Sequence, residues 1–418
     1  MKQTARIIST YSADAFGVCS ALFELGGMTI MHDASGCNST YTTHDEPRWF
    51  DMDSMVYISG LSEMEAIMGD DEKLIDDIVD AATNLQPAFI AICGTPIPMM
   101  TGFDFEAVAE VVEMRTGIPS FGFPTSGMKT YIDGASMALA GIARRMVSDV
   151  DPEEIANPVG MIVKSGSSPA FFDAPRVNIL GLTPLDFSVN GSDASIADWL
   201  TECGFEVVSK WAMGSTLDEI RQAGRADVNL VVSAAGLGAA KVLYERFGIP
   251  YVIGQPVGED QKDILRDAVN ELTFESRAIR HSEDGAAGQG TESISVLSDL
   301  ADADADAAPE IIVIGEGISS LALASAIEFE TGRATKVLCA TECPEELLRD
   351  CDRMTPDEDD IIPELEGASV IIADPLYQPI CPQEARFIAL PTEAFSGRIY
   401  RDDIPDLIRD PHAVTGQL

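Results

Sequence analysis

Short runs of apolar and β-branched residues recur along the whole chain, each ending at or near Gly, Pro, Ser or Asp. Runs this uniformly apolar suit parallel strands that are buried on both faces of a sheet. They predict four strands in each third of the chain: Met28–His32, Val56–Gly60, Phe89–Gly94 and Pro119–Pro124; Val177–Leu182, Glu206–Trp211, Leu230–Ser233 and Pro250–Gly254; Glu310–Gly315, Lys336–Ala340, Ser369–Asp374 and Arg386–Pro391.

Helical patterns fill the gaps between these runs. Met64–Thr83 carries apolar residues at helical spacing with acidic residues opposite, Phe105–Thr116 stops at Gly117, and Ser195–Glu202 stops at Gly204. Glycines in these positions are typical helix terminators. The alternation of strands and helices predicts an α/β fold of three units, each with a mainly parallel four- to five-stranded sheet flanked by helices.

Changes in composition suggest where the units meet. Val150–Glu154 and Ser165–Ala170 favour a first linker, and the acidic, low-complexity stretch Ser298–Ala308 favours a second. His281–Glu292 is Gly-rich and polar, which is typical of a loop. We therefore expect domains at residues 1–160, 161–300 and 301–418.

Composition excludes several classes of protein. Of the 418 residues, 46% are hydrophobic and 23% charged, which is globular rather than disordered, collagen-like or coiled-coil. No apolar run is long enough to cross a bilayer and the first residues contain no signal-peptide core, so we expect a soluble, cytoplasmic protein. The net charge of −42 argues against nucleic-acid or membrane binding, although a salt-adapted or generally acidic proteome would also produce it.

Most candidate motifs do not indicate a catalytic or cofactor-binding site. Ile311–Ser320 resembles a dinucleotide fingerprint, but Ser320 replaces the third glycine, so we expect no nicotinamide site. The sequence contains no P-loop, HExxH or GxSxG motif, and its four histidines are scattered. Cys339, Cys343 and Cys351, with Cys381 later, follow no recognised cluster spacing and are interpreted as buried or incidental thiols.

The first unit holds the most informative residues. His32-Asp33-Ala34-Ser35-Gly36-Cys37 follows directly on one strand, and Cys93 stands near the end of another. Loops at the carboxyl edge of a parallel sheet are where sites form. Two thiols at one edge could share a metal centre.

These residues resemble a known family. His32–Cys37 is similar to the H-G-x-x-G-C turn of the nitrogenase component 1 superfamily, and Ile92-Cys93-Gly94-Thr95 is similar to its Thr/Cys-rich turn. Val177–Leu182, Trp199–Val207 and Asp227–Val232 resemble its second domain. The resemblance implies three Rossmann-like domains. The superfamily includes nitrogenase subunits, their cofactor-assembly homologues and protochlorophyllide reductases.

The chain also departs from the family pattern. Counting back from Cys37 to the position of the family's first cysteine reaches Ser12, so Cys19 or Asp14 would have to replace that ligand. Ser233 stands where catalytic nitrogenase has the cysteine that holds its metal cofactor. A serine hydroxyl is a poor ligand for soft iron. We therefore expect no nitrogenase-type metal cofactor.

The resemblance implies an oxidoreductase subunit. It would accept electrons from an ATP-dependent, P-loop iron-protein reductase through a 4Fe-4S cluster shared between two subunits, with Cys37, Cys93 and Cys19 as candidate ligands. The partner would be a second copy or a related component 1 subunit. A substrate would bind in a cleft between domains near Ser233, Gly236 and Lys129. Two alternatives stay open: a cofactor-assembly scaffold, and a cluster-free structural subunit of a hetero-oligomer.

Overall fold

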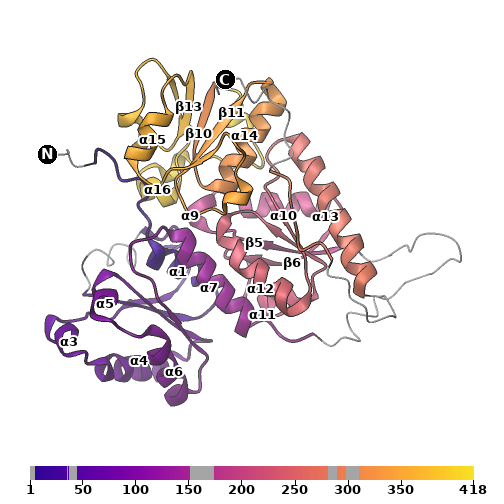
Figure 1. Ribbon diagram of the computed structural model, residues 1–418. Helices are drawn as coiled ribbons and strands as arrows, with labels where there is room; N and C mark the ends of the chain where they lie inside the picture. The colour runs from indigo at the N-terminus through magenta and orange to yellow at the C-terminus, as the bar shows by residue number, and fades with distance from the viewer. Residues whose placement is uncertain (1–4, 35, 37–44, 151–173, 281–289, 298–309) are drawn as a thin grey trace, which may run out of the picture.

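A computed structural model of the chain contains three parallel sheets, each flanked by helices (Figure 1). It describes residues 5–34, 36, 45–150, 174–280, 290–297 and 310–418. Every strand pair in these sheets is parallel, as the uniformly apolar runs predict. Within the described helices, none is both long and apolar enough to cross a membrane.

The first sheet has the strand order β2-β1-β3-β4. Helices α1 and α7 pack on one of its faces, whereas α4 and α6 pack on the other, so the sheet separates two hydrophobic clusters. The bounds are β1 Met28–His32, β2 Met55–Ile58, β3 Ile90–Gly94, β4 Ser120–Phe123, α1 Asp14–Leu22, α3 Glu63–Met68, α4 Asp71–Leu85, α5 Pro96–Thr101, α6 Phe105–Thr116 and α7 Tyr131–Arg145.

The second sheet has the order β6-β5-β7-β8-β9. Helix α12 packs against α7, which brings the first and second sheets together through a helix layer (Figure 1). The bounds are β5 Arg176–Leu180, β6 Glu206–Trp211, β7 Val228–Val231, β8 Tyr251–Ile253, β9 Ser293–Ser295, α9 Pro184–Phe187, α10 Ser192–Glu202, α11 Leu217–Arg221, α12 Leu237–Phe247 and α13 Glu259–Arg280.

The third sheet has the order β12-β11-β10-β13-β14. Its helix α14 contacts α13 of the second unit, and α16 contacts α9. The bounds are β10 Ile311–Gly315, β11 Thr335–Cys339, β12 Arg353–Met354, β13 Val370–Ala373, β14 Arg386–Ala389, α14 Gly317–Thr331, α15 Glu358–Glu364, α16 Glu393–Ser396 and α17 His412–Thr415.

The α/β fold class and all the predicted strands are confirmed, with their ends moved by one or two residues. The single helix expected over Met64–Thr83 is wrong. The chain forms α3 and α4 there, because Gly69 adopts a left-handed φ of 64° that ends α3. The short strands β9 and β12 were not predicted. The domain boundaries stay predictions, since both expected linkers fall largely outside the described residues.

A buried arginine ties the first sheet's helices to the second sheet. The Arg48 guanidinium forms ion pairs with Glu24, at 2.9 Å, and Glu46, at 2.6 Å, and donates to the carbonyl of Ala212 at 3.5 Å. Glu24 in turn accepts a hydrogen bond from the backbone N–H of Gly214 at 2.7 Å. These contacts fix the position of the first sheet against the segment that follows β6.

Candidate functional site

Of the two cysteines predicted at the first sheet's carboxyl edge, the structure describes Cys93, which lies near the end of β3 with its thiol buried. Cys93 in β3 and Cys19 in α1 are fully buried in the same hydrophobic cluster, and a side-chain hydrogen bond links their thiols. Burial, followed by the neighbouring Cys93, raises the pKa of the Cys19 thiol well above its usual value. Cys37 lies outside the described residues. The structure thus brings Cys19 and Cys93 together, under α1.

At the carboxyl edge of the first sheet, the described polar side chains are hydroxyl, carboxyl and imidazole groups that bond to each other. Thr95 Oγ1 donates to Asp33 Oδ1 at 2.7 Å, and His32 Nδ1 lies 2.9 Å from Ser59 Oγ. The His32 ring also packs on Phe103, with ring centroids 4.4 Å apart. Burial lowers the pKa of His32 to about 4, so this imidazole is neutral at physiological pH.

The position of the family's first cysteine, Ser12, is buried, and so is Asp14, which together with Cys19 was expected as a replacement ligand. Ser12 is 3% exposed. The Asp14 carboxylate accepts backbone N–H bonds from Ala15, Ser126 and Gly127, each at 2.8 Å. Burial raises the pKa of Asp14 while these three N–H groups lower it. Asp14 therefore joins α1 to the loop that precedes α7.

These residues do not complete a ligand set for an iron–sulfur cube. Such a cube needs four protein ligands, usually thiolates. No group of three or more His, Cys, Asp or Glu side chains in the described parts of the chain could hold a metal ion. The Cys19–Cys93 pair supplies two soft donors, but burial disfavours the Cys19 thiolate and both sulfurs face the core. The described residues alone therefore do not fit the cluster.

The residues predicted to line the cleft make contacts within the protein instead of facing an open cavity. Ser233 is fully buried, and its Oγ donates to the carbonyl of Gly181 at 2.7 Å. Gly236 allows a close approach, because a Cβ there would lie 2.6 Å from the carbonyl oxygen of Leu180. Lys129 is more than half exposed and pairs with Asp133 at 2.9 Å. Ser233 and Gly236 thus join β5 to the turn after β7, while Lys129 is occupied at the surface.

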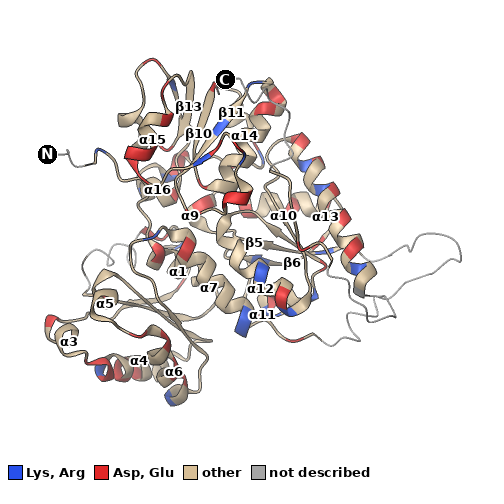
Figure 2. Cartoon of the chain, viewed as in Figure 1, with Lys and Arg blue, Asp and Glu red and all other residues tan. Residues whose placement is uncertain are grey.

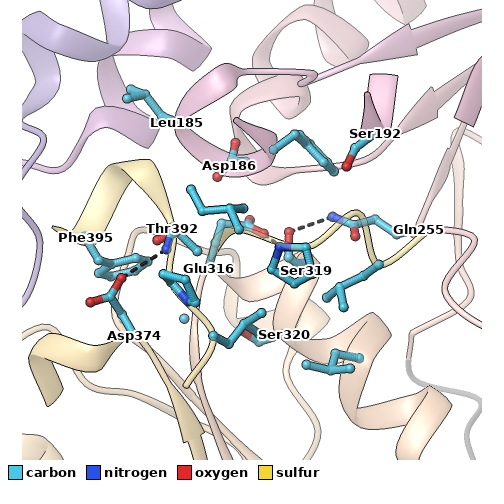
Figure 3. A pocket seen from close by; sticks show the side chains of 18 of the residues that line it. Leu185, Asp186, Ser192, Gln255, Glu316, Ser319, Ser320, Asp374, Thr392 and Phe395 are labelled. Atoms are coloured by element: carbon cyan, nitrogen blue, oxygen red, sulfur yellow. Dashed lines mark hydrogen bonds between the residues drawn. The ribbon is translucent and has the colours of Figure 1, made fainter. Parts of the chain in front are cut away.

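A pocket opens where the carboxyl edges of the second and third sheets face each other (Figure 3). The cavity itself has a volume of about 70 Å³, and its open mouth brings the empty space to about 740 Å³. Its walls are mainly apolar. The described residues that line it are Tyr131, Leu185, Asp186, Phe187, Ser192, Gln255, Ile314, Gly315, Glu316, Ser319, Ser320, Leu323, Asp374, Leu390, Pro391, Thr392, Phe395, Ile404, Pro405, Leu407 and Ile408.

Asp186 is the central titratable group of this pocket. It lies in α9, the short helix after β5, where Thr183 is the N-cap. Tyr131 from α7 donates a short hydrogen bond to Asp186 Oδ1, and Thr183 Oγ1 donates to Oδ2 at 2.7 Å. Burial and the neighbouring Glu316 raise the pKa of Asp186 to about 7. Asp186 therefore gains or loses its proton near neutral pH.

Glu316 faces Asp186 from the third sheet. It is the N-cap of α14, where Oε2 accepts from the backbone N–H of Ser319 at 2.8 Å, and Oε1 accepts from that of Ala234 at 3.0 Å. Burial raises the pKa of Glu316, but backbone N–H groups stabilise its charged form. Since two buried carboxylates repel each other, Asp186 and Glu316 do not ionise independently, and Glu316 contributes to the raised pKa of Asp186.

A third carboxylate lines the opposite wall. Asp374 follows β13 and accepts backbone N–H bonds from Leu376 and Thr392, both at 3.0 Å (Figure 3). Burial raises the pKa of Asp374. Thr392 Oγ1 is buried and has no hydrogen-bond partner among the described residues. An unsatisfied buried hydroxyl in a pocket wall marks a place for a ligand atom or water.

Sequence reasoning missed Asp186, Glu316 and Asp374 as site residues. Glu316 lies in the Gly315–Ser320 turn, which was considered only for nicotinamide binding. Asp374 ends a predicted strand, and Asp186 follows Thr183-Pro184 after another. All three stand at carboxyl edges of parallel strands. Their position at those edges was the available signal.

Comparisons with known proteins place this fold and site in context. The family model "Nitrogenase component 1 type Oxidoreductase" matches residues 14–372. The nitrogenase iron-molybdenum cofactor biosynthesis protein NifE of Clostridium pasteurianum is 25% identical over 272 residues, covering 63% of this chain and 54% of that protein. One subunit of the light-independent protochlorophyllide reductase of Prosthecochloris aestuarii is 33% identical over 101 residues, covering 23% of this chain and 19% of that protein.

A solved structure shows the same fold. The structure "Nitrogenase Cp1 at pH 6.5" superposes with a TM-score of 0.65 at 16% identity, covering 100% of this chain and 93% of that one. The chain spans about half the length of the curated relatives it matches first. The family match covers most of the chain, and the fold agrees with it. The chain belongs to the nitrogenase component 1 type oxidoreductase family.

Proposed function

We propose that this chain is a reductase subunit that reduces an organic substrate in the pocket between the second and third sheets, with Asp186 as the proton donor. Asp186, which holds a proton near neutral pH beside Glu316 and Tyr131, is the observation that carries the proposal. Reduction of an unsaturated bond by two electrons also consumes two protons. Asp186 would give the first, and water entering through the open mouth of the pocket would give the second. Electrons would come from an ATP-dependent iron-protein reductase.

The side chains around Asp186 suit it to this role. Tyr131 and Thr183 orient the carboxyl by hydrogen bonds, and Tyr131 is fully buried. The pKa of Tyr131 is raised well above its usual value, first by burial, so its phenol keeps its own proton. The neighbouring Glu316 contributes, after burial, to the raised pKa of Asp186 and so favours a proton on it. An acid with a pKa near the working pH donates most effectively.

A second candidate function is a scaffold that holds a precursor without reducing it. The similarity to NifE, a cofactor biosynthesis protein, favours it. A scaffold needs the pocket but needs no proton donor inside it. The two functions therefore differ in what the Asp186→Asn variant would do to the bound molecule.

The test compares the small molecules that copurify anaerobically with the wild type and with Asp186→Asn. We expect the wild type, supplied with its reductase, to release a product heavier than its substrate by two hydrogen atoms. The Asp186→Asn variant should retain the unreduced molecule, because the proton donor is gone. Mass spectrometry of the extracts checks this. The same unreduced molecule in both proteins would contradict the reductase and favour the scaffold.

The shared 4Fe-4S cluster stays a prediction. An isologous dimer interface with Cys37 and Cys93 from each of two subunits would supply four thiols, and it would require the Cys93 thiol, buried under α1, to become accessible. The Cys37→Ser/Cys93→Ser variant should then lose all bound iron, while Cys339→Ser, Cys343→Ser and Cys351→Ser should keep it. Iron and sulfide analysis with electron paramagnetic resonance, on protein purified anaerobically, measures this. If the double variant retains iron, Cys37 and Cys93 are not the ligands.

An apolar surface on the first unit supports the proposed dimer. Helices α3 and α5 lie next to each other and expose Met64, Ile67, Met68, Ile97, Met99 and Met100. In Figure 2, α5 carries no charged side chain. Helix α3 also carries Glu63 and Glu65, so the apolar side chains of the patch are what favours contact between copies of a chain of charge −42. We propose that a second copy of the chain covers it.

Charges placed on this patch should separate the subunits. Met64 and Met68 are 67% and 72% exposed, so a Met64→Glu/Met68→Glu variant leaves the core intact while adding repulsion at the interface. We expect light scattering to show a dimer for the wild type and a monomer for the variant. Met114→Glu on α6, where Met114 is 76% exposed, is the matched control and should stay dimeric. A variant that dimerises like the control would rule the patch out.

A further inference from the structure

The polar groups that the pocket offers to a ligand are mainly hydrogen-bond acceptors. The carboxyls of Asp186, Glu316 and Asp374 accept hydrogen bonds, and each ionised oxygen has two lone pairs. The Gln255 amide nitrogen is occupied by bonds of 2.6 Å to the Val232 carbonyl and to Ser319 Oγ. That leaves the carbonyl oxygen of Gln255 for a ligand. A ligand that donates hydrogen bonds would match these groups.

Positive charge is missing from the same walls. Among the described residues that line the pocket there is no Lys, Arg or His. Lys129, which was expected to bring a cation to the cleft, pairs with Asp133 instead. An anionic ligand would thus meet repulsion from at least one ionised carboxylate in a low-dielectric space, where such repulsion is strong. A cationic ligand or one rich in N–H donors would relieve it.

The remaining walls set the shape of the ligand. Phe395, Leu323, Leu407 and Ile408 present apolar side chains. Figure 3 shows that Asp186 reaches the cavity from the second sheet's side, while Glu316 and Asp374 come from the third sheet's side. Asp186 and Glu316 thus lie close together in an otherwise apolar cavity, while Asp374 lies apart from them beside Thr392 (Figure 3). A molecule with an apolar body and one polar end matches this arrangement.

We propose that the pocket selects an organic molecule with an apolar body and a cationic or N–H-donating group that binds between Asp186 and Glu316. This inference rests on the proposed function, since it names the substrate class of the same site. The donor group would pair with Glu316 and the second lone pairs of Asp186. Carboxylate-bearing and phosphate-bearing molecules are excluded by the same charges.

Three probes of one size and different charge test the selectivity: benzamidine, benzamide and benzoate. Titrations are monitored by isothermal calorimetry and by protein NMR, in about 1 M salt, where the Debye length is about 3 Å and surface charges are screened. We expect benzamidine to bind at least tenfold more tightly than benzamide and benzoate not to bind. Benzamidine binding should strengthen as the pH rises through about 7, because Asp186 becomes ionised.

Variants locate the binding. Glu316→Gln and Asp186→Asn should each weaken benzamidine tenfold or more, while Glu202→Gln, an exposed carboxylate on α10, should leave it unchanged. Thermal melting of each variant confirms that it is folded. If benzoate binds as well as benzamidine, or if Glu316→Gln changes nothing, the selectivity is overturned while the reductase proposal stands. Loss of product formation in Asp186→Asn tests the reductase proposal separately.

Discussion

Replacing Gly134 by Ala is expected to destabilise the first unit strongly. Gly134 lies in α7 where that helix crosses α1, and a Cβ there would lie 1.8 Å from the carbonyl oxygen of Asp14. The obstacle is backbone, so no side-chain rotation relieves it, and the two helices must move apart. Overpacking of this kind costs about 3 kcal/mol or more, against about 1 kcal/mol that Ala gains over Gly in a helix.

The guanidinium unfolding midpoint, followed by circular dichroism, measures the effect. Gly17→Ala should behave alike, because a Cβ there would lie 2.0 Å from the carbonyl oxygen of Tyr131 on the facing helix. Gly36→Ala is the control, since no atom of the described residues lies within 4 Å of the position of its Cβ. Midpoints for Gly134→Ala and Gly36→Ala that agree with each other would show that α1 and α7 do not cross this closely. The crossing matters for the site because it sets the position of Tyr131 against Asp186.

The Asp186→Asn variant is expected to be more stable than the wild type at pH 8, and its free energy of unfolding should depend less on pH. The folded state raises the pKa of Asp186 to about 7 from the ordinary value of 3.8, so it binds more protons than the unfolded state between these pH values. The free energy of unfolding therefore falls as the pH rises from about 4 to about 7, by on the order of 1.4 kcal/mol per pH unit, and levels off above.

The difference between variant and wild type isolates Asp186 together with its neighbouring carboxylate. The carboxylates far from Asp186 also titrate, but they are common to both proteins and cancel. The charges of Glu316 and Asp186 interact, so the pH-dependent difference reports on the pair. We expect the two proteins to differ little at pH 4 and the variant to gain stability steadily up to pH 7. Glu202→Gln, which removes an exposed carboxylate, should show no such trend. A constant difference between Asp186→Asn and wild type at all pH values would contradict the raised pKa.

The fold was predictable because its signals are local. Strands buried on both faces, such as Met28–His32, leave apolar runs that can be found in the sequence without knowing their neighbours. Gly69 was harder to interpret, since the apolar spacing continues across it from α3 into α4. The strand β9, Ser293–Ser295, has three residues, two of them Ser, and only its pairing with β8 makes it a strand.

The site was less predictable because its residues meet only in three dimensions. The sequence correctly predicted Cys93 at the end of a strand. Because that strand is buried on both faces, its sequence has no polar–apolar alternation that would show which face the Cys93 side chain is on. Its thiol packs under α1 beside Cys19. Asp186 and Glu316 belong to different sheets, and each looks like an ordinary helix-start acid in the sequence. Their linked ionisation follows from burial and proximity, which no local pattern encodes.

Infrared titration of Asp186 tests the central claim most directly. A protonated carboxyl has a carbonyl stretch that is separate from the bands of an ionised carboxylate, and burial sharpens the distinction. The difference spectrum between wild type and Asp186→Asn should show a protonated carboxyl at pH 6 that disappears as the pH rises through about 7. A difference spectrum that shows Asp186 already ionised at pH 6 would contradict the proton donor and, with it, the proposed reduction in this pocket.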